Sequence, residues 1–161
     1  MSLALTTMAV EPKQRVEALV EEVISDSSLF LVEVVVRGRK GSQVVEVYLD
    51  SDVALDVEGL ARVSREVSFL LETEEVFSGM YHLNVSSPGA DRPLLLPRQF
   101  PKHVGRTLAV ISKGGQGEPT VTTTGTLQTV DEQGIALSLS KGEPHRFSFE
   151  EIVEARVVLP W

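Results

Sequence analysis

The side chains that most often catalyse reactions or bind metals are sparse and scattered in this chain. Its 161 residues include three histidines and no cysteine, so a thiolate metal site and a disulfide framework are both excluded. The histidines are His82, His103 and His145. None has a second histidine or a carboxylate at a spacing that would build a metal site within one element. We therefore expect no catalytic residue, no metal and no cofactor.

Sequence motifs of hydrolases and nucleotide-binding enzymes are absent as well. There is no G-x-S-x-G, P-loop or H-E-x-x-H pattern. The glycine-rich residues 114–117 lack the following Lys-Ser/Thr and the helix that phosphate binding requires, so a hairpin loop is expected there. Paired acids such as Glu74-Glu75 and Glu150-Glu151 are expected in solvated turns, where nothing tunes a catalytic acid. An enzyme is not expected. The alternative, a hydrolase with an unrecognised carboxylate site, predicts turnover that is lost when one acid is replaced.

One dense group of cations lies in the first half of the chain, at Arg37, Arg39 and Lys40. Cations at a hairpin tip are able to contact nucleic-acid phosphates, each adding a salt-dependent increment of affinity. The alternative is a solvated turn whose charges discourage aggregation. No aromatic residue is interleaved with these cations, so stacking on bases is not indicated.

Negative charge is concentrated in the same half. The formal net charge is −8, and residues 1–92 hold 16 acids against 8 Lys and Arg, whereas residues 93–161 hold seven of each. Nucleic acid is bound mainly through Lys and Arg. The acidic half is therefore a poor autonomous RNA binder and is better suited to a basic protein partner. Alternatively, the charge serves only solubility.

The elements that position these groups follow from hydrophobic periodicity. Residues 11–92 are predicted to form a first domain of order α-β-β-α-β. Apolar residues at helical spacing predict one helix that ends before Asp26 and another capped by Asp56. Alternating residues predict strands over 29–37, 44–50 and 81–86. Two amphipathic helices on one face of a three-stranded sheet would make a two-layer domain.

Two further expectations concern particular residues of this domain. On the first strand, we expect Phe30, Val32, Val34 and Val36 to share one face. Gly59, in the first turn of the second helix, is expected to weaken that turn.

The character of the sequence changes after Pro93. Prolines recur along a connector, and the remainder is rich in residues that favour β-strands. Short strands separated by turns predict a small SH3-like or Sm-like β-barrel over residues 93–161. The strands are expected at 106–112, 120–130, 133–140, 144–149 and 152–158. The fold class is thus α+β. Residues 1–10 show no periodicity and are predicted to be a disordered N-terminus.

The most specific stretch is SSPGADRPL, residues 86–94. Pro88-Gly89 suits a type II turn, because proline fixes φ at the second position and glycine permits positive φ at the third. Pro93 then favours an extended Arg92. Generic turn chemistry does not explain the paired serines before this turn, or Asp-Arg-Pro-Leu after it.

In this stretch the chain resembles the RimP family of bacterial ribosome maturation factors, whose V-S-S-P-G-x-D-R-P-L motif is matched by residues 85–94. Residues 60–65 are similar to the family's second helix, and residues 152–160 to its final strand. Phe100 and Gly105-Arg106 resemble the entry to its second domain. The resemblance implies the two domains already predicted from periodicity.

The resemblance also implies a function. Such a protein would bind the small (30S) ribosomal subunit or its precursor and assist its assembly, contacting a basic ribosomal protein beside the decoding centre, with 16S rRNA in context. We expect a cytoplasmic monomer without a membrane partner, since no apolar run approaches the roughly 20 residues that span a bilayer. The alternative is a general RNA-binding module of KH-like or Sm-like type. The net charge and the lack of a G-x-x-G loop speak against it.

The role of the 86–94 stretch stays open between two possibilities. In the first it is a partner-binding surface with Arg92 as its anchor, and in the second it is a lock between the domains. The residues concerned are Ser86, Ser87, Pro88, Gly89, Asp91 and Arg92.

Overall fold

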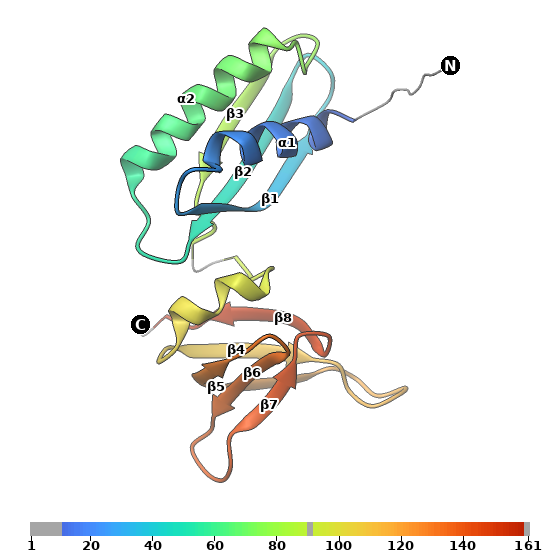
Figure 1. The fold of residues 1–161 in the computed structure, drawn as a ribbon. Coiled ribbons are helices and arrows are strands. Elements are labelled where there is room, and N and C mark those ends of the chain that lie inside the picture. Colours follow the sequence, from blue (N-terminus) through green and yellow to red (C-terminus); the bar gives the residue numbers. More distant parts are fainter. Residues whose placement is uncertain (1–10, 90–91, 160–161) are drawn as a thin grey trace, which may run out of the picture. The chain divides into compact units, whose positions relative to one another are not determined.

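The computed structural model describes residues 11–89 and 92–159. The predicted disordered segment 1–10 therefore lies outside the described residues. The chain divides into two compact units, Met1–Ser87 and Pro88–Trp161, each with its own hydrophobic core. Both units are drawn in Figure 1.

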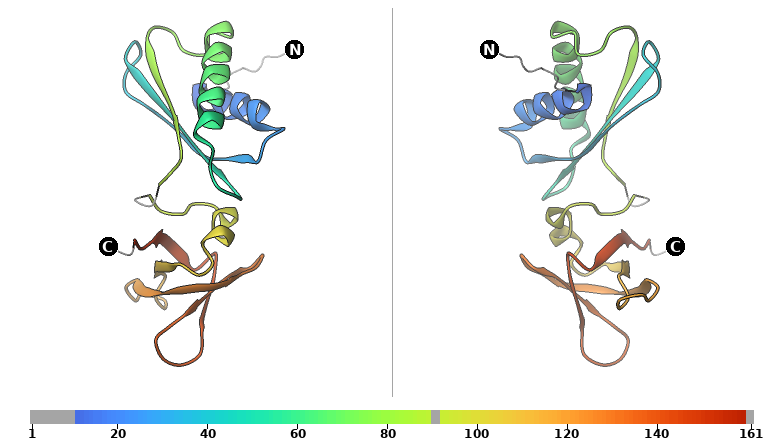
Figure 2. Two further views of the ribbon diagram at one scale, coloured as in Figure 1. Left: turned by 90° about the vertical axis from the view of Figure 1, so that its left-hand side faces the viewer. Right: turned by 90° about the vertical axis from the view of Figure 1, so that its right-hand side faces the viewer.

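The first unit has the predicted order of elements. They are α1 (Pro12–Ile24), β1 (Leu29–Arg37), β2 (Gln43–Ser51), α2 (Val57–Thr73) and β3 (Tyr81–Ser86). The sheet order is β1-β2-β3, with β1 antiparallel and β3 parallel to β2. Parallel pairing requires a crossover, and α2 provides it. Figure 2 shows both helices against one face of this sheet, which confirms the predicted two-layer arrangement.

Each helix begins where its sequence predicts. Pro12 occupies the first turn of α1, where its missing N–H costs nothing. Asp56 caps α2, because its Oδ1 accepts the backbone N–H of Glu58 at 3.1 Å. The buried stripes of the two helices face the sheet and consist of Val16, Leu19, Val20 and Ile24 on α1 and Val63, Val67 and Leu71 on α2.

The predicted face of β1 is wrong in its first half. A bulge between Leu31 and Glu33 shifts the register against β2, and an extra residue on one strand reverses which side chains face the core. Leu31 therefore pairs with Leu49 and packs on the core, as do Val34 and Val36 farther along. Phe30 and Val32 are not members of that core cluster.

The second unit is a five-stranded antiparallel sheet, β7-β6-β5-β4-β8. Its strands are β4 (Thr107–Ser112), β5 (Val121–Val130), β6 (Gly134–Ser138), β7 (His145–Ser148) and β8 (Ile152–Val157). The proline-rich connector forms two short 3₁₀ turns, η2 (Pro97–Gln99) and η3 (Pro101–His103). Among the described residues the pairing does not close β7 onto β8, so the β-rich domain is confirmed and a closed barrel is not.

Within the described ranges, no helix combines the length and apolarity needed to cross a membrane. The fold as a whole is α+β, with the mixed α/β layer first and the antiparallel sheet second.

Candidate functional site

The predicted hairpin cations lie where expected, at the β1–β2 connection, but they are not equivalent. The Nε of Arg37 bonds Oε1 of Glu46 on the neighbouring strand at 3.2 Å. The hydroxyl of Tyr48 donates to the other oxygen of Glu46 at 3.3 Å. Arg37 is thus held in a local network on the sheet, while Arg39 and Lys40 are exposed in the turn.

The 86–94 stretch joins the two units. Ser86 ends β3, Ser87 is half-buried, and Pro88 is buried. Gly89 has φ of +70°, the positive value that the predicted type II turn needs at its third position. Asp91 lies outside the described residues, so its predicted role has no structural counterpart. Arg92 is half-buried at the start of the second unit.

The described residues contain no group of three or more His, Asp and Glu side chains able to hold a metal ion. His82 and His145 are exposed on separate strands, and His103 belongs to η3. The structure does not bring the predicted site residues together into one chemical centre.

One hollow of the first unit lies between the end of α1 and the middle of α2. We call it the α1–α2 groove, and it encloses about 540 Å³, within the range typical of ligand sites. Its lining residues are Glu22, Val23, Asp26, Ser27, Arg62, Arg65, Glu66, Phe69 and Leu70.

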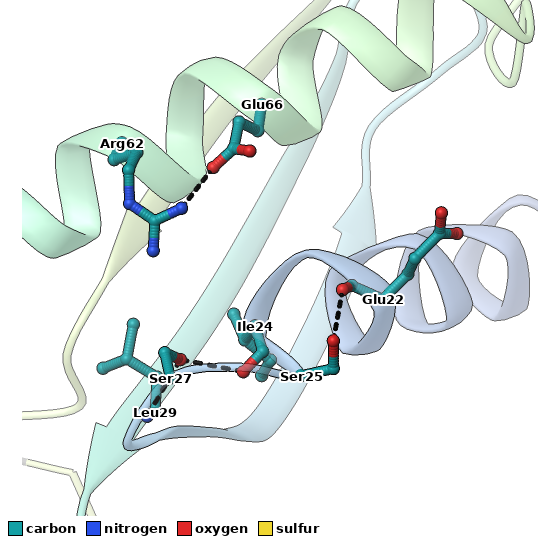
Figure 3. Close-up of polar contacts among 7 residues, drawn as sticks. All are labelled: Glu22, Ile24, Ser25, Ser27, Leu29, Arg62 and Glu66. Atoms are coloured by element: carbon teal, nitrogen blue, oxygen red, sulfur yellow. Dashed lines mark hydrogen bonds and ion pairs between the residues drawn. The ribbon is translucent and has the colours of Figure 1, made fainter.

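Polar contacts fix both walls of the α1–α2 groove, as Figure 3 shows. On the α2 wall, Nη1 of Arg62 bonds Oε2 of Glu66 at 2.6 Å, one helical turn away. On the α1 wall, the hydroxyl of Ser25 donates to the carbonyl of Glu22 at 2.9 Å, and that of Ser27 to the carbonyl of Ile24 at 2.8 Å. These two hydroxyls satisfy carbonyls that the helix end leaves without intrahelical partners.

The electrostatics of the helix ends are unusual. The last turns of α1 and α2 contain no basic residue, although cations are the charges that a helix C-terminus favours. Glu21 and Glu22 lie in the last turn of α1, and Asp26 follows it. Each acid placed this way opposes the helix dipole by about 0.3–1 kcal/mol. These acids do not stabilise the helix that carries them.

Phe69 is the residue of the groove that sequence analysis missed. Its side chain is 68% exposed on α2. The buried stripe of α2 passes through Val63, Val67 and Leu71, so Phe69 is a large aromatic residue off the helical stripe. That departure from periodicity is the signal that could have identified it.

A smaller hollow of about 400 Å³ lies over α2 and the start of β3, around Tyr81. Burial raises the pKa of the Tyr81 phenol above its usual 10.0, the nearby Glu72 charge raises it further, and the neighbouring Ser68 side chain offsets part of the rise. The ring packs against that of Phe77 at a tilt of 32°, with 5.1 Å between centroids. Tyr81 is therefore neutral at physiological pH and serves as a packing residue.

A comparison with known protein families finds a match to the first unit. Residues 19–91 match the RimP N-terminal domain. The match covers the second half of α1, all of β1, β2, α2 and β3, and the start of the joining stretch. It agrees with the resemblance seen in residues 85–94. The match identifies the first unit as a RimP N-terminal domain and so supports membership of the RimP family of ribosome maturation factors.

Proposed function

We propose that this protein binds the small (30S) ribosomal subunit or its precursor in the cytoplasm and assists its assembly by docking a basic ribosomal protein near the decoding centre. The match of residues 19–91 to the RimP N-terminal domain carries the proposal. The protein acts as a monomer and meets 16S rRNA only in the context of the subunit.

The charge of the first domain supports a protein partner over free RNA. Acids outnumber Lys and Arg by 16 to 8 over residues 1–92, and the last turn of α1 holds acids and no basic residue. Complementary potentials raise the rate of encounter with a basic partner. Of the hairpin cations, Arg39 and Lys40 are exposed and free to approach rRNA phosphates once the protein has docked, whereas Arg37 is paired with Glu46.

For the stretch of Ser86 to Arg92 we favour a role in fixing the chain path between the units over a role in contacting the partner. The buried Pro88 and the positive φ of Gly89 support a rigid turn. Arg92→Ala separates the two roles. Lost subunit binding with unchanged melting contradicts the lock, and lowered melting with normal binding contradicts the contact surface.

Co-sedimentation in sucrose gradients tests the main proposal. The full chain should migrate with small subunits and their precursors, and chemical crosslinking should join it to a basic ribosomal protein. Absence from those fractions contradicts the proposal. Tight binding to free RNA at physiological salt, without ribosomal protein, would instead support a general RNA-binding module.

A further inference from the structure

We propose that the α1–α2 groove binds an extended, arginine-containing segment of a basic protein, with the guanidinium between Glu22 and Asp26 and stacked on Phe69. The inference rests on the proposed function in that it names the surface by which the basic partner is held. It goes further by specifying the side chain recognised and the residues that recognise it.

The carboxylates of Glu22 and Asp26 form the anionic end of the groove. Glu22 lies in the last turn of α1 and Asp26 two residues beyond its end, both line the same groove, and their like charges repel. Both are exposed, and neither takes part in an ion pair in the part of the chain that the structure describes. A cation between them relieves this repulsion and also the opposition to the dipole of α1.

The opposite wall supplies an aromatic surface. Phe69 exposes 68% of its side chain and lines the same groove as the two acids. Val23 and Leu70 are half-buried beside it and provide apolar contact for the methylene stem of a long side chain. An aromatic ring and carboxylates that line one groove suit a guanidinium, which is able to stack flat on a ring while its N–H groups bond acids.

The basic residues of the groove orient the ligand and do not cancel the acids. Arg62 is already paired with Glu66 at 2.6 Å, so its charge is satisfied within α2. Arg65 is exposed on the same helix. It repels a second cation on the α2 side and attracts a carbonyl or carboxylate of the bound segment. The groove thus favours a segment in which a single arginine is flanked by apolar residues over a run of lysines.

The size of the groove selects a short segment. A volume of about 540 Å³ accommodates a few side chains, far fewer than the roughly 20–30 residues a side of a standard interface between folded domains. The occupant is therefore a loop or tail of the partner.

Binding of synthetic peptides to the full chain tests the proposal. The probes are short Gly-Ser peptides in which a single arginine is flanked by leucines, with lysine or citrulline as replacements for that arginine. At a salt concentration of about 0.1 M, which leaves close charge pairs only partly screened, the arginine peptide should bind. The lysine peptide should bind about threefold to tenfold more weakly, since it lacks the planar fork and stacks less well. The citrulline peptide, which is uncharged, should not bind measurably.

Variants of exposed groove residues identify the contacts. Glu22→Gln and Asp26→Asn should each weaken the arginine peptide about tenfold, because each removes one charge-assisted contact. Phe69→Leu keeps apolar area but should abolish the preference for arginine over lysine. Glu21→Gln is the matched control, since it removes the same charge from the same turn at a position outside the groove. Urea unfolding of each variant checks that the fold is intact.

Several results would overturn the inference. Equal affinity for the arginine and citrulline peptides would remove the guanidinium as the determinant. An equal loss in Glu21→Gln and Glu22→Gln would show that only net charge acts. Phe69-dependent self-association of the protein would assign the groove to a second copy, and tighter peptide binding after deletion of residues 1–10 would assign it to that segment.

Co-sedimentation distinguishes this failure from failure of the proposed function. If the Glu22→Gln/Asp26→Asn double variant sediments with small subunits as the unaltered protein does, the function stands and the groove is not the contact. If arginine peptides bind but the unaltered protein never meets the subunit, the groove is a peptide site and the ribosomal role falls.

Discussion

The guanidinium of Arg15, in the first turn of α1, bonds both the backbone carbonyl and the side-chain carboxylate of Glu74, at the C-terminal cap of α2. Nη2 of Arg15 donates to the carbonyl oxygen of Glu74 at 3.4 Å and to its Oε1 at 3.2 Å. Because α2 has no basic residue in its own last turn, the cation that suits its C-terminus comes from the other helix.

Replacing Arg15 should lower the free energy of unfolding slightly more than removing an unpaired positive charge from the same turn. Arg15→Gln removes a pair whose side chains are 35% and 44% exposed, so solvent screening limits the loss in free energy of unfolding to about 0.5 kcal/mol. Urea denaturation measures it. Lys13→Gln is the control, because it removes the same charge from an exposed position of the same turn. Equal losses in the two variants would mean that the contact with Glu74 contributes nothing.

Gly59→Ala should stabilise the first domain. Gly59 lies in α2, and an added Cβ meets the side chain of Asp56 at an ordinary 3.7 Å. Alanine should therefore raise the free energy of unfolding by about 0.5–1 kcal/mol through helix propensity and reduced freedom of the unfolded chain. Gly41→Ala provides the opposite case, since its φ of +93° strains any residue with a Cβ. Thermal melting should move upward for the first variant and downward for the second.

Gln99 should be among the polar residues to which the second domain is most sensitive. It is fully buried, and its Oε1 accepts the backbone N–H groups of Leu95 at 2.8 Å and Leu96 at 2.9 Å. Gln99→Met keeps the volume but removes the acceptor, so the free energy of unfolding should fall by about 2 kcal/mol. Gln116→Met, in an exposed loop, should change it little. Chemical denaturation of both variants makes the comparison, and a neutral Gln99→Met would contradict the acceptor role.

Asp131 should make the second domain less stable in acid. A hydrogen bond from Arg146, followed by bonds from the backbone of Gln133 and Gly134, holds the pKa of the Asp131 carboxyl below its usual 3.8. A lowered pKa in the folded state adds stability that is complete above the ordinary pKa and is lost as pH falls through the folded value. The stability difference between the unaltered protein and Asp131→Asn should be constant from neutral pH to about pH 5 and shrink below about pH 4. Urea unfolding across this range measures it, and a difference that is unchanged in acid would contradict the assignment.

The helices were predictable because their signals are local. The apolar stripes, Pro12 in the first turn of α1 and the Asp56 cap of α2 all depend on residues within a turn or two of each other. The bulge between Leu31 and Glu33 was not predictable, because it is defined by pairing with β2. The open pairing of the second sheet depends likewise on which strands meet.

Only separate residues of the candidate groove could be predicted from the sequence. Glu22 and Asp26 are visible in the sequence as acids at the end of a predicted helix, and Phe69 as an aromatic residue off the stripe of another. Their meeting depends on how α1 and α2 pack on the sheet, which no local pattern specifies. Conversely, the 86–94 stretch was conspicuous in sequence, yet the structure gives its described residues the role of a turn between units.

The parallel pairing of β2 with β3 determines an order of folding. The β1–β2 hairpin closes over a short turn, whereas β3 reaches β2 only after α2 has crossed the sheet. Contacts between distant residues form late, since closing the longer loop costs more entropy. During synthesis, both strands of the hairpin are present once Ser51 has been made, whereas the three-stranded sheet is complete only after Ser86. The turn that begins at Ser87 is therefore the first segment made after the first domain is complete.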